Sequence, residues 1–262
     1  SCDIIRKNPY RLCEIAGISF EKADDIASQM ELSPGSTERI QAGMLYILNH
    51  NMNNGGHTFL PKEKLFSVCR SMLDPEESAL QSAYDTLIEN RSLVYRPKIS
   101  NTDGVYLRWV YECEENIARR ICLSAMMKRN YPGNFEKDIA QIEKDLGLHF
   151  AENQKEAIRE AYLNHFMVLT GGPGTGKTTT LNGMIRLFEQ NGISFAIAAP
   201  TGRAAKRVTE LSGKEAKTIH RLLEYKPPEG YQKNEESPLN GDVLILDECS
   251  MIDVMLMYNL LK

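Results

Sequence analysis

Residues 171–178 read Gly-Gly-Pro-Gly-Thr-Gly-Lys-Thr, which satisfies the phosphate-loop pattern G-x-x-x-x-G-K-[ST]. Glycines let successive backbone N–H groups turn toward phosphate oxygens, and a helix that follows directs the positive end of its dipole at the same anion. The apolar run 166–170 before the loop predicts a strand, and the helical spacing of apolar residues over 181–188 predicts a helix. This order restricts the C-terminal half to an α/β fold with a parallel sheet that binds a nucleoside triphosphate.

Each part of the loop has an expected role in binding ATP and Mg²⁺. Lys177 is expected to reach the β and γ phosphates, and the hydroxyl of Thr178 to ligate Mg²⁺. The alternative is a glycine-rich turn that binds no ligand. The predicted nucleotide-binding residues of the loop are Gly171, Gly172, Pro173, Gly174, Thr175, Gly176, Lys177, Thr178 and Thr179.

The composition is that of a globular protein, with 42% hydrophobic and 25% charged residues in a chain of 262, enough for two or three domains. The formal net charge of −4 provides no overall positive field, so any contact with nucleic acid has to be local. The six cysteines include no C-x-x-C pair, which favours reduced thiols over disulfides or a zinc site. No apolar stretch approaches the roughly 18 residues that span a bilayer, so we expect a cytoplasmic protein with no membrane partner.

The two ends of the sequence indicate a fragment of a longer protein. The chain begins with Ser1 rather than Met, and it ends at Lys262 inside an apolar run with helical spacing. We therefore expect the C-terminal α/β domain to be truncated.

Short helices separated by turns are predicted for residues 1–50. Apolar residues recur at helical spacing on both sides of Gly17-Ile18-Ser19, and a third helix is expected after Ser36. A helix-hairpin-helix unit of this kind can offer turn amides to a DNA phosphate. The alternative is that the helices only pack together around the glycine.

Residues 51–113 are expected to form a winged-helix-like module. Helical segments precede two strand-like pieces, 93–95 and 105–110, and Asp103-Gly104 between them is a hairpin signal. Trp109 is expected in the core of that hairpin rather than as a platform for stacking a base.

Residues 114–147 are expected to form a helical connector, with one helix over 114–130, and the α/β domain then occupies 148–262. Within that domain, the polar and proline-containing stretch 227–238 is expected to be a mobile surface loop.

The apolar run 243–246 predicts a buried strand that ends in an acidic pair, Asp247 and Glu248. This is the Walker B arrangement, in which Asp247 holds Mg²⁺ through water and Glu248 orients and deprotonates the attacking water. An acidic pair at a strand end can instead cap a helix. We take Lys177, Asp247 and Glu248 as candidate catalytic residues, and Thr178 and Asp247 as the candidate Mg²⁺ ligands.

Three further features accompany these motifs. Gln154, in a helical segment before the loop, carries an amide that can read an adenine edge, although a surface glutamine is the default. The strand 195–199 runs into hydroxyl and basic residues that suit the backbone of single-stranded nucleic acid, or that form a capped helix with a solvated basic face. His220 begins a short helix, where it either couples to nucleotide or DNA or is a surface residue. The candidate DNA-binding residues are Pro200, Thr201, Gly202, Arg203 and His220.

Taken together in this order, these motifs resemble those of superfamily 1 DNA helicases, and most closely the RecD-like branch. That branch comprises the α subunit of exodeoxyribonuclease V and its stand-alone bacterial relatives. The segments 8–12, 17–24 and 56–61 resemble the helical region that precedes the motor in the long, stand-alone members. The motifs that carry the resemblance are Gln154, Gly-Gly-Pro-Gly-Thr-Gly-Lys-Thr, Ala-Pro-Thr-Gly-Arg-Ala-Ala, Thr-Ile-His-Arg-Leu-Leu and Asp-Glu-Cys-Ser-Met-Ile-Asp.

The resemblance implies a RecA-like α/β motor domain and ATP-driven 5′ to 3′ translocation along single-stranded DNA, coupled to duplex opening. It implies single-stranded DNA and duplex junctions as partners, with other recombination or repair proteins as further candidates. By resemblance, Gln154 reads adenine and residues 201–203 lie against the DNA strand. The phosphate loop and the pair Asp247 and Glu248 take the roles given above.

The sequence departs from the family pattern in two ways. Cys249 stands where alanine is usual, and the later motifs, including a second motor domain with its arginine finger, are absent. An arginine that stabilises the transferring phosphoryl group is worth about 10³ to 10⁵ in rate. We therefore expect this chain to bind ATP but to hydrolyse it poorly.

Two other functions remain open. A RecA-like ATPase that is not a helicase needs neither the basic stretch after residue 199 nor the upstream glutamine. Alternatively, residues 1–110 could dock DNA or a protein beside a nucleotide-binding domain. A nuclease is not favoured, because the sequence offers no acidic metal cluster beyond the Walker B pair.

Overall fold

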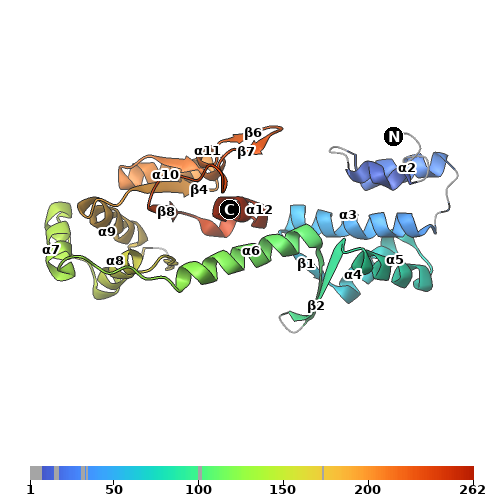
Figure 1. Cartoon of the computed structure of the whole chain (residues 1–262), viewed down its shortest axis with the longest axis horizontal. Coiled ribbons are helices and arrows are strands. Elements are labelled where there is room, and N and C mark those ends of the chain that lie inside the picture. The colour runs from blue at the N-terminus through green and yellow to red at the C-terminus, as the bar shows by residue number, and fades with distance from the viewer. Residues whose placement is uncertain (1–7, 15–17, 31–32, 34, 100–101, 173) are drawn as a thin grey trace. The chain divides into compact units, whose positions relative to one another are not determined.

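The computed structural model describes residues 8–14, 18–30, 33, 35–99, 102–172 and 174–262. The chain divides into two compact units, Ser1–Cys113 and Glu114–Lys262. Figure 1 labels most of the helices and strands of both units.

Helices form most of the first unit. The 3₁₀ helix η1 (Pro9–Glu14) is followed by α2 (Phe20–Gln29) and α3 (Thr37–Gly55). The hydroxyls of Ser19 and Ser36 accept backbone hydrogen bonds at the starts of α2 and α3, which stabilises both helix N-termini. Helices thus flank the predicted turn at Gly17-Ile18-Ser19, but Gly17 lies outside the described residues.

Helix α3 forms the centre of this unit, packing against α4 (Lys62–Leu73) and α5 (Glu77–Glu89). Its side chains Ile40 and Met44 are fully buried. Gly43 permits the close approach of α3 and α4, because a Cβ at that position would lie 2.5 Å from Leu73 Cδ1.

A three-stranded antiparallel sheet completes the first unit, with strand order β1-β3-β2. It comprises β1 (Phe59–Pro61), β2 (Leu93–Ile99) and β3 (Thr102–Leu107), and Tyr95 pairs with Val105 in its register. The predicted pairing of two strands is therefore present, but Asp103 and Gly104, which were expected to form the turn, lie within β3, where Gly104 pairs with Arg96.

The predicted strand 105–110 is wrong in its last three residues. Helix α6 (Arg108–Ala125) begins directly after β3, and Arg108 forms an ion pair with Glu112 one turn later. The helix buries Val110 rather than Trp109, whose residue surface is 38% exposed. The expectation that Trp109 lies in the hairpin core is therefore also wrong.

The second unit contains helices α7 (Phe135–Leu146), α8 (Glu152–Leu163) and α9 (Lys177–Gln190). The predicted single helix over 114–130 is displaced along the chain, because α6 begins at Arg108 and ends at Ala125. Lys128 instead makes an antiparallel bridge to Asn164, which fixes this stretch in an extended conformation.

A parallel sheet of three strands lies beside these helices, in the order β5-β4-β8. The strands are β4 (Phe195–Ala199), β5 (Ala216–Thr218) and β8 (Val243–Leu246), and helix α10 (Gly202–Ser212) connects β4 to β5. Ala198 of β4 faces Leu246 of β8 in the register. This arrangement confirms the predicted α/β domain with a parallel sheet.

Two details of the predicted sheet are wrong. The run 166–170 was predicted to be a strand, but these described residues form none. They keep the alternating exposure of a strand, since Val168 is 71% exposed and Met167 packs toward the core. The four residues of β8 are half-buried rather than buried. Among the described strands, β8 pairs only with β4, so one of its edges lacks the neighbour that would cover it.

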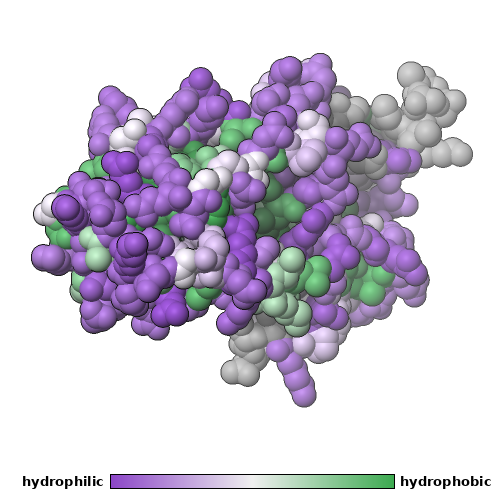
Figure 2. Space-filling view, turned by 60° about the vertical axis from the view of Figure 1, so that its left-hand side comes forward, coloured by the Kyte–Doolittle hydropathy of each residue, from purple (hydrophilic) through white to green (hydrophobic). Residues whose placement is uncertain are grey.

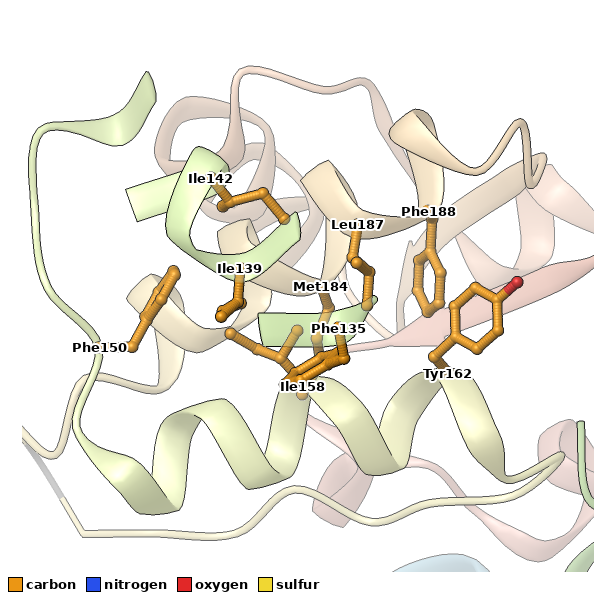
Figure 3. Close-up of a cluster of buried hydrophobic side chains, with 9 residues drawn as sticks. All are labelled: Phe135, Ile139, Ile142, Phe150, Ile158, Tyr162, Met184, Leu187 and Phe188. Atoms are coloured by element: carbon orange, nitrogen blue, oxygen red, sulfur yellow. The ribbon is translucent and has the colours of Figure 1, made fainter. Parts of the chain in front are cut away.

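The core of the second unit is formed where α7, α8 and α9 converge (Figure 3). Gly183 of α9 allows α8 to approach closely, since a Cβ there would lie 2.5 Å from Ile158 Cδ1. Packing at native density fixes α9 relative to α8 and to the sheet. The buried side chains of this cluster are Phe135, Ile139, Ile142, Phe150, Ile158, Tyr162, Met184, Leu187 and Phe188.

The predicted mobile loop 227–238 is partly ordered. After the short helix α11 (Ile219–Leu222), strands β6 (Tyr225–Lys226) and β7 (Gly230–Tyr231) form an antiparallel hairpin. The chain then continues through β8, the 3₁₀ helix η2 (Cys249–Met251) and α12 (Val254–Leu261).

Among the described residues, no helix has both the length and the apolar character needed to cross a membrane. On the face drawn in Figure 2, hydrophilic residues predominate and apolar residues appear in small groups between them.

Candidate nucleotide and nucleic-acid site

Three of the predicted site residues follow the carboxyl ends of the parallel strands. Thr201 comes two residues after β4, His220 comes two residues after β5, and Asp247 directly follows β8. Because β4 pairs in parallel with both β5 and β8, these ends lie at the same edge of the sheet. In open α/β sheets this is the edge at which ligands bind.

Helix α9, which begins at the end of the phosphate loop, precedes β4 in the chain. Residues 191–194 connect the end of α9 to the start of β4 by a tight turn, in which Gly192 has a φ of +68°. Helix α9 packs on the sheet through Ile185, which shares a buried cluster with Ile197 of β4.

The phosphate loop has the backbone geometry that an anion cradle requires. Gly174 and Gly176 have φ values of +75° and +80°, in the left-handed region that glycine adopts without strain. A Cβ on Gly171 would lie 2.7 Å from Thr175 Oγ1, so a side chain there would have to displace the Thr175 hydroxyl. Pro173 lies outside the described residues.

Lys177 lies across the loop rather than pointing away from it. Its Nζ donates hydrogen bonds to the carbonyl oxygens of Gly171 at 2.5 Å and Gly172 at 2.9 Å, and the Thr175 hydroxyl donates to Gly172 as well. The amine is thus already held over the loop by oxygen acceptors. Phosphate oxygens can replace those carbonyls without a large movement of the side chain, so the residues present fit a nucleoside triphosphate.

The threonines after Lys177 lie on the first turns of α9. Thr178 and Thr179 are half-buried, whereas Thr180 is buried and its hydroxyl donates to the carbonyl of Gly176 at 3.0 Å. The predicted Mg²⁺ ligand Thr178 therefore retains access to the loop, and Thr180 serves the structure of the helix.

Gln154 is brought to the phosphate loop by α8. Its Oε1 accepts a hydrogen bond from the Ala151 backbone N–H at 2.9 Å, which orients the side chain at the start of the helix. Its Nε2 then lies against Gly176, where a Cβ would come within 2.4 Å of it. Gln154 is therefore not a surface residue without contacts, which was the alternative interpretation.

The Walker B pair is anchored by the sheet. The backbone N–H of Asp247 donates to the carbonyl of Ala198 at 3.0 Å, which continues the pairing of β8 with β4. Glu248 then adopts a left-handed conformation with a φ of +52°, rare for a residue with a side chain and common at functional turns. The Cys249 thiol donates to the carbonyl of Leu246 at 3.6 Å, and burial raises the pKa of this thiol.

The stretch after β4 forms a capped helix. The hydroxyl of Thr201 accepts a hydrogen bond from the Ala204 backbone N–H at 3.2 Å, and α10 then presents Arg203 to solvent. Pro200 is half-buried and Gly202 is exposed. The stretch therefore forms the capped helix that was one of the two alternatives. The exposed guanidinium of Arg203 is also accessible to a DNA phosphate.

His220 is part of an aromatic group that sequence reasoning missed. Its ring contacts Tyr225 edge-on at 5.7 Å and Tyr231 at 5.9 Å, and the two tyrosines pair across the hairpin at 4.9 Å. Tyr225 is 46% exposed. The sequence feature that could have predicted this group is the pair of tyrosines on either side of Pro-Pro-Glu-Gly, a typical turn sequence. An open hollow of about 520 Å³ adjoins this group, lined by Thr218, His220, Arg221, Glu224, Tyr225 and Lys226.

Within the described part of the chain, no three His, Cys, Asp or Glu side chains gather as metal ligands do. A Mg²⁺ ion at this site would thus depend on the phosphates together with Thr178 and Asp247, as is usual for Mg²⁺.

Comparisons with known proteins match both halves of the chain. A family model described as "ATP-dependent RecD2 DNA helicase HHH domain" matches residues 1–59, and one described as "AAA domain" matches residues 154–262. The ATP-dependent RecD2 DNA helicase of Deinococcus radiodurans is 32% identical over 268 residues, which cover 99% of this chain and 37% of that protein. The chain has the N-terminal HHH and AAA regions of a RecD2-like DNA helicase.

The chain is also similar to proteins named RecBCD enzyme subunit RecD. The one from Mycolicibacterium smegmatis is 35% identical over 156 residues, which cover 50% of this chain and 27% of the relative. The one from Haemophilus influenzae is 32% identical over 153 residues, which cover 47% of this chain and 24% of the relative. The chain thus spans between 24% and 37% of the length of these relatives.

These matches confirm the predicted family resemblance. A match to an AAA domain over residues 154–262 implies ATP binding, and a match to an HHH domain over residues 1–59 suggests DNA binding.

Proposed function

We propose that the protein to which this chain belongs is an ATP-dependent DNA helicase that moves 5′ to 3′ along single-stranded DNA and opens duplexes at junctions. The observation that supports this most is the shared carboxyl edge of the sheet. The acidic pair after β8 and the Thr201 cap of α10 follow strands that end at that edge, and the phosphate loop leads into α9, which packs on the same sheet. Nucleotide and DNA elements on adjacent strands are what a motor needs to convert hydrolysis into movement.

The proposed roles follow from the chemistry of each group. The loop amides and Lys177 bind the triphosphate, Gln154 binds the adenine, and Thr178 with Asp247 holds Mg²⁺. When bound, Mg²⁺ neutralises the negative charge that develops on the phosphate oxygens. Glu248 orients the attacking water and accepts its proton.

The DNA strand is proposed to lie against the stretch from Pro200 to Arg203, with His220 nearby. Hydroxyls, backbone N–H groups and cations bind phosphates without reading the sequence. Because the net charge of the chain is −4, this contact depends on local groups and should weaken steeply with added salt. The HHH region supplies a second proposed contact to DNA.

We further propose that residues 1–262 on their own bind ATP but turn it over slowly and do not unwind DNA. The test of binding is titration with a fluorescent ATP analogue. Lys177→Ala should abolish binding, because it removes the cation above the loop. Lys137→Ala, which removes an exposed lysine from α7, should leave binding unchanged. Robust unwinding by the 262 residues alone would contradict the proposal.

The direction of movement needs the protein at its natural full length. Duplexes that carry a single-stranded tail at either the 5′ or the 3′ end should be unwound only when the tail is on the 5′ side. Preference for a 3′ tail, or hydrolysis that DNA stimulates without strand separation, would favour the non-helicase ATPase instead.

A further inference from the structure

An ion pair links the proposed DNA-binding helix to the proposed catalytic glutamate. Arg207 lies on α10, and its Nη1 is 3.9 Å from Oε1 of Glu248. The two residues are attached to neighbouring strands, because α10 follows β4 while Glu248 follows β8. The register that pairs Ala198 with Leu246 holds both attachment points at the same level of the sheet. The pair therefore joins segments that follow two neighbouring strands of one sheet.

Arg207 is also placed where a DNA strand could reach it. Arg203 and Arg207 are four residues apart on α10, so they lie on the same side of the helix. The opposite side, with Ala204, Ala205 and Val208, is buried. The Arg207 side chain is 70% exposed although it contacts Glu248. One guanidinium is thus shared between the surface proposed for DNA and the carboxylate proposed to activate water.

The neighbouring lysine differs in this respect. Lys206 forms its ion pair with Glu210, one turn further along α10, at 3.8 Å. Its charge is therefore balanced within the helix, whereas the charge of Arg207 is directed toward a residue of a different element. This contrast provides a matched acidic control, because Glu210 and Glu248 both pair with cations of α10.

We propose that Arg207 is a positioning residue that couples DNA binding to the action of Glu248. A phosphate of the DNA strand competes with the Glu248 carboxylate for the guanidinium of Arg207. When the phosphate takes the guanidinium, the carboxylate is released to accept a proton from the attacking water. This inference rests on the proposed function and adds a means by which DNA stimulates hydrolysis.

The size of the effect follows from the exposure of the pair. Exposed ion pairs contribute little to an equilibrium, so releasing Arg207 from Glu248 should change DNA affinity by about 1.5- to 5-fold. That range is measurable by anisotropy of a labelled oligonucleotide. An ion pair of this strength is also too weak to prevent a DNA phosphate from displacing the Glu248 carboxylate.

The first experiment is a double-mutant cycle on DNA affinity in the absence of nucleotide. Binding of a fluorescent oligothymidylate at one low salt concentration is measured for the wild type, Glu248→Gln, Arg207→Gln and the double variant. Glu248→Gln should tighten binding about 1.5- to 5-fold when Arg207 is present and leave it unchanged when Arg207 is replaced. Glu210→Gln, the matched control, should have the same effect in both backgrounds.

The outcomes separate this inference from the proposed function. If Glu248→Gln tightens binding equally in both backgrounds, loss of a negative charge explains the result, and the coupling is overturned. If the wild-type chain binds no oligonucleotide, the proposed function fails and the coupling fails with it. Because all these side chains are at least partly exposed, thermal unfolding should show that each variant remains folded.

A second measurement uses ATP hydrolysis by the full-length protein. Arg207→Gln should raise kcat without DNA, leave KM for ATP unchanged and reduce the ratio of DNA-stimulated to basal rate. Arg207→Lys should restore part of that ratio, because a lysine keeps the charge without the planar geometry of the guanidinium. Arg186→Gln removes an exposed guanidinium that pairs with Glu189 on α9, and it should leave the ratio unchanged. An unchanged ratio in Arg207→Gln would overturn the proposal.

Discussion

The side-chain amide of Gln154 lies directly against the backbone of Gly176, so closely that a Cβ on Gly176 would be 2.4 Å from Gln154 Nε2. The contact joins the start of α8 to the last turn of the phosphate loop. Gln154 is itself oriented by the hydrogen bond from the Ala151 N–H. The group proposed to read the base and the loop proposed to bind the phosphates thus hold one another in place.

Gly176→Ala should therefore abolish binding of a fluorescent ATP analogue. The substitution places a methyl group on Gln154 and forces a residue with a φ of +80° to carry a side chain, which costs about 1–2 kcal/mol of stability. Gly192→Ala is the matched control, because its φ is +68° but a Cβ there meets nothing within 4 Å. Both variants should lose similar stability in thermal unfolding, and only Gly176→Ala should lose nucleotide binding. Equal loss of binding in the two variants would show that strain alone is responsible.

Gln154→Ala should reduce the preference for ATP over GTP. A hydrogen bond of this kind contributes about 0.5–1.5 kcal/mol, so ATP affinity should fall by about 2- to 10-fold while GTP affinity changes little. The measurement is competition of unlabelled ATP and GTP against a fluorescent analogue. Gln141→Ala is the control, since Gln141 donates to Asp145 within α7. A parallel loss of affinity for both nucleotides would mean that Gln154 supports the loop and does not read the base.

The parts of the fold that could be predicted from sequence are those in which a local pattern is sufficient. The phosphate-loop pattern fixes glycines at positions 171 and 176, and Gly176, like Gly174, adopts a left-handed conformation. The run 243–246 before Asp247 similarly predicts β8, because β-branched and aliphatic residues in a short apolar run favour a strand.

The features that were missed depend on partners distant in sequence. The run 166–170 has a strand pattern, yet a strand exists only where a neighbouring strand supplies hydrogen bonds. The residues after Leu107 have strand propensity, but burial of Val110 on a helix outweighs it. The hairpin at 225–231 is stabilised by the pairing of Tyr225 with Tyr231. The turn residues between them do not by themselves predict this pairing.

Tyr225→Ala should weaken binding of single-stranded DNA. Stacking of a base on an exposed aromatic ring is worth about 1–3 kcal/mol, which corresponds to a 5- to 150-fold loss of affinity. Tyr225 is 46% exposed beside Lys226 and the ring of His220, so it offers both a stacking face and nearby cationic charge. Tyr225→Phe should retain most of the affinity, because the ring remains. The assay is fluorescence anisotropy with an oligothymidylate.

Tyr95→Ala controls for the loss of an exposed tyrosine, since Tyr95 is 38% exposed and donates to Asp103 in the first unit. If Tyr225→Ala binds DNA as well as the wild type does, the aromatic group at the hairpin is structural only.

The last prediction concerns the stability of the first unit in acid. Arg39 donates from Nε to Asp24 at 2.8 Å and from Nη2 at 3.0 Å, and the hydroxyl of Tyr10 donates to the same carboxylate at 2.7 Å. The hydrogen bonds from Arg39 hold the pKa of Asp24 below its ordinary value of 3.8. They also raise the pKa of Arg39, and burial raises that of Tyr10.

Because the folded-state pKa of Asp24 is lower than the unfolded-state pKa, the stabilisation is complete above about pH 4 and is lost as pH falls through the folded value. Asp24→Asn should therefore be less stable than the wild type at pH 7, with the difference shrinking below pH 4. Asp25→Asn, at the exposed neighbouring position, controls for the loss of one negative charge. The measurement is urea unfolding followed by the fluorescence of Trp109, the only tryptophan, which lies in this unit. A difference that stays constant from pH 7 to pH 2.5 would show that Asp24 acts through packing rather than through its charge.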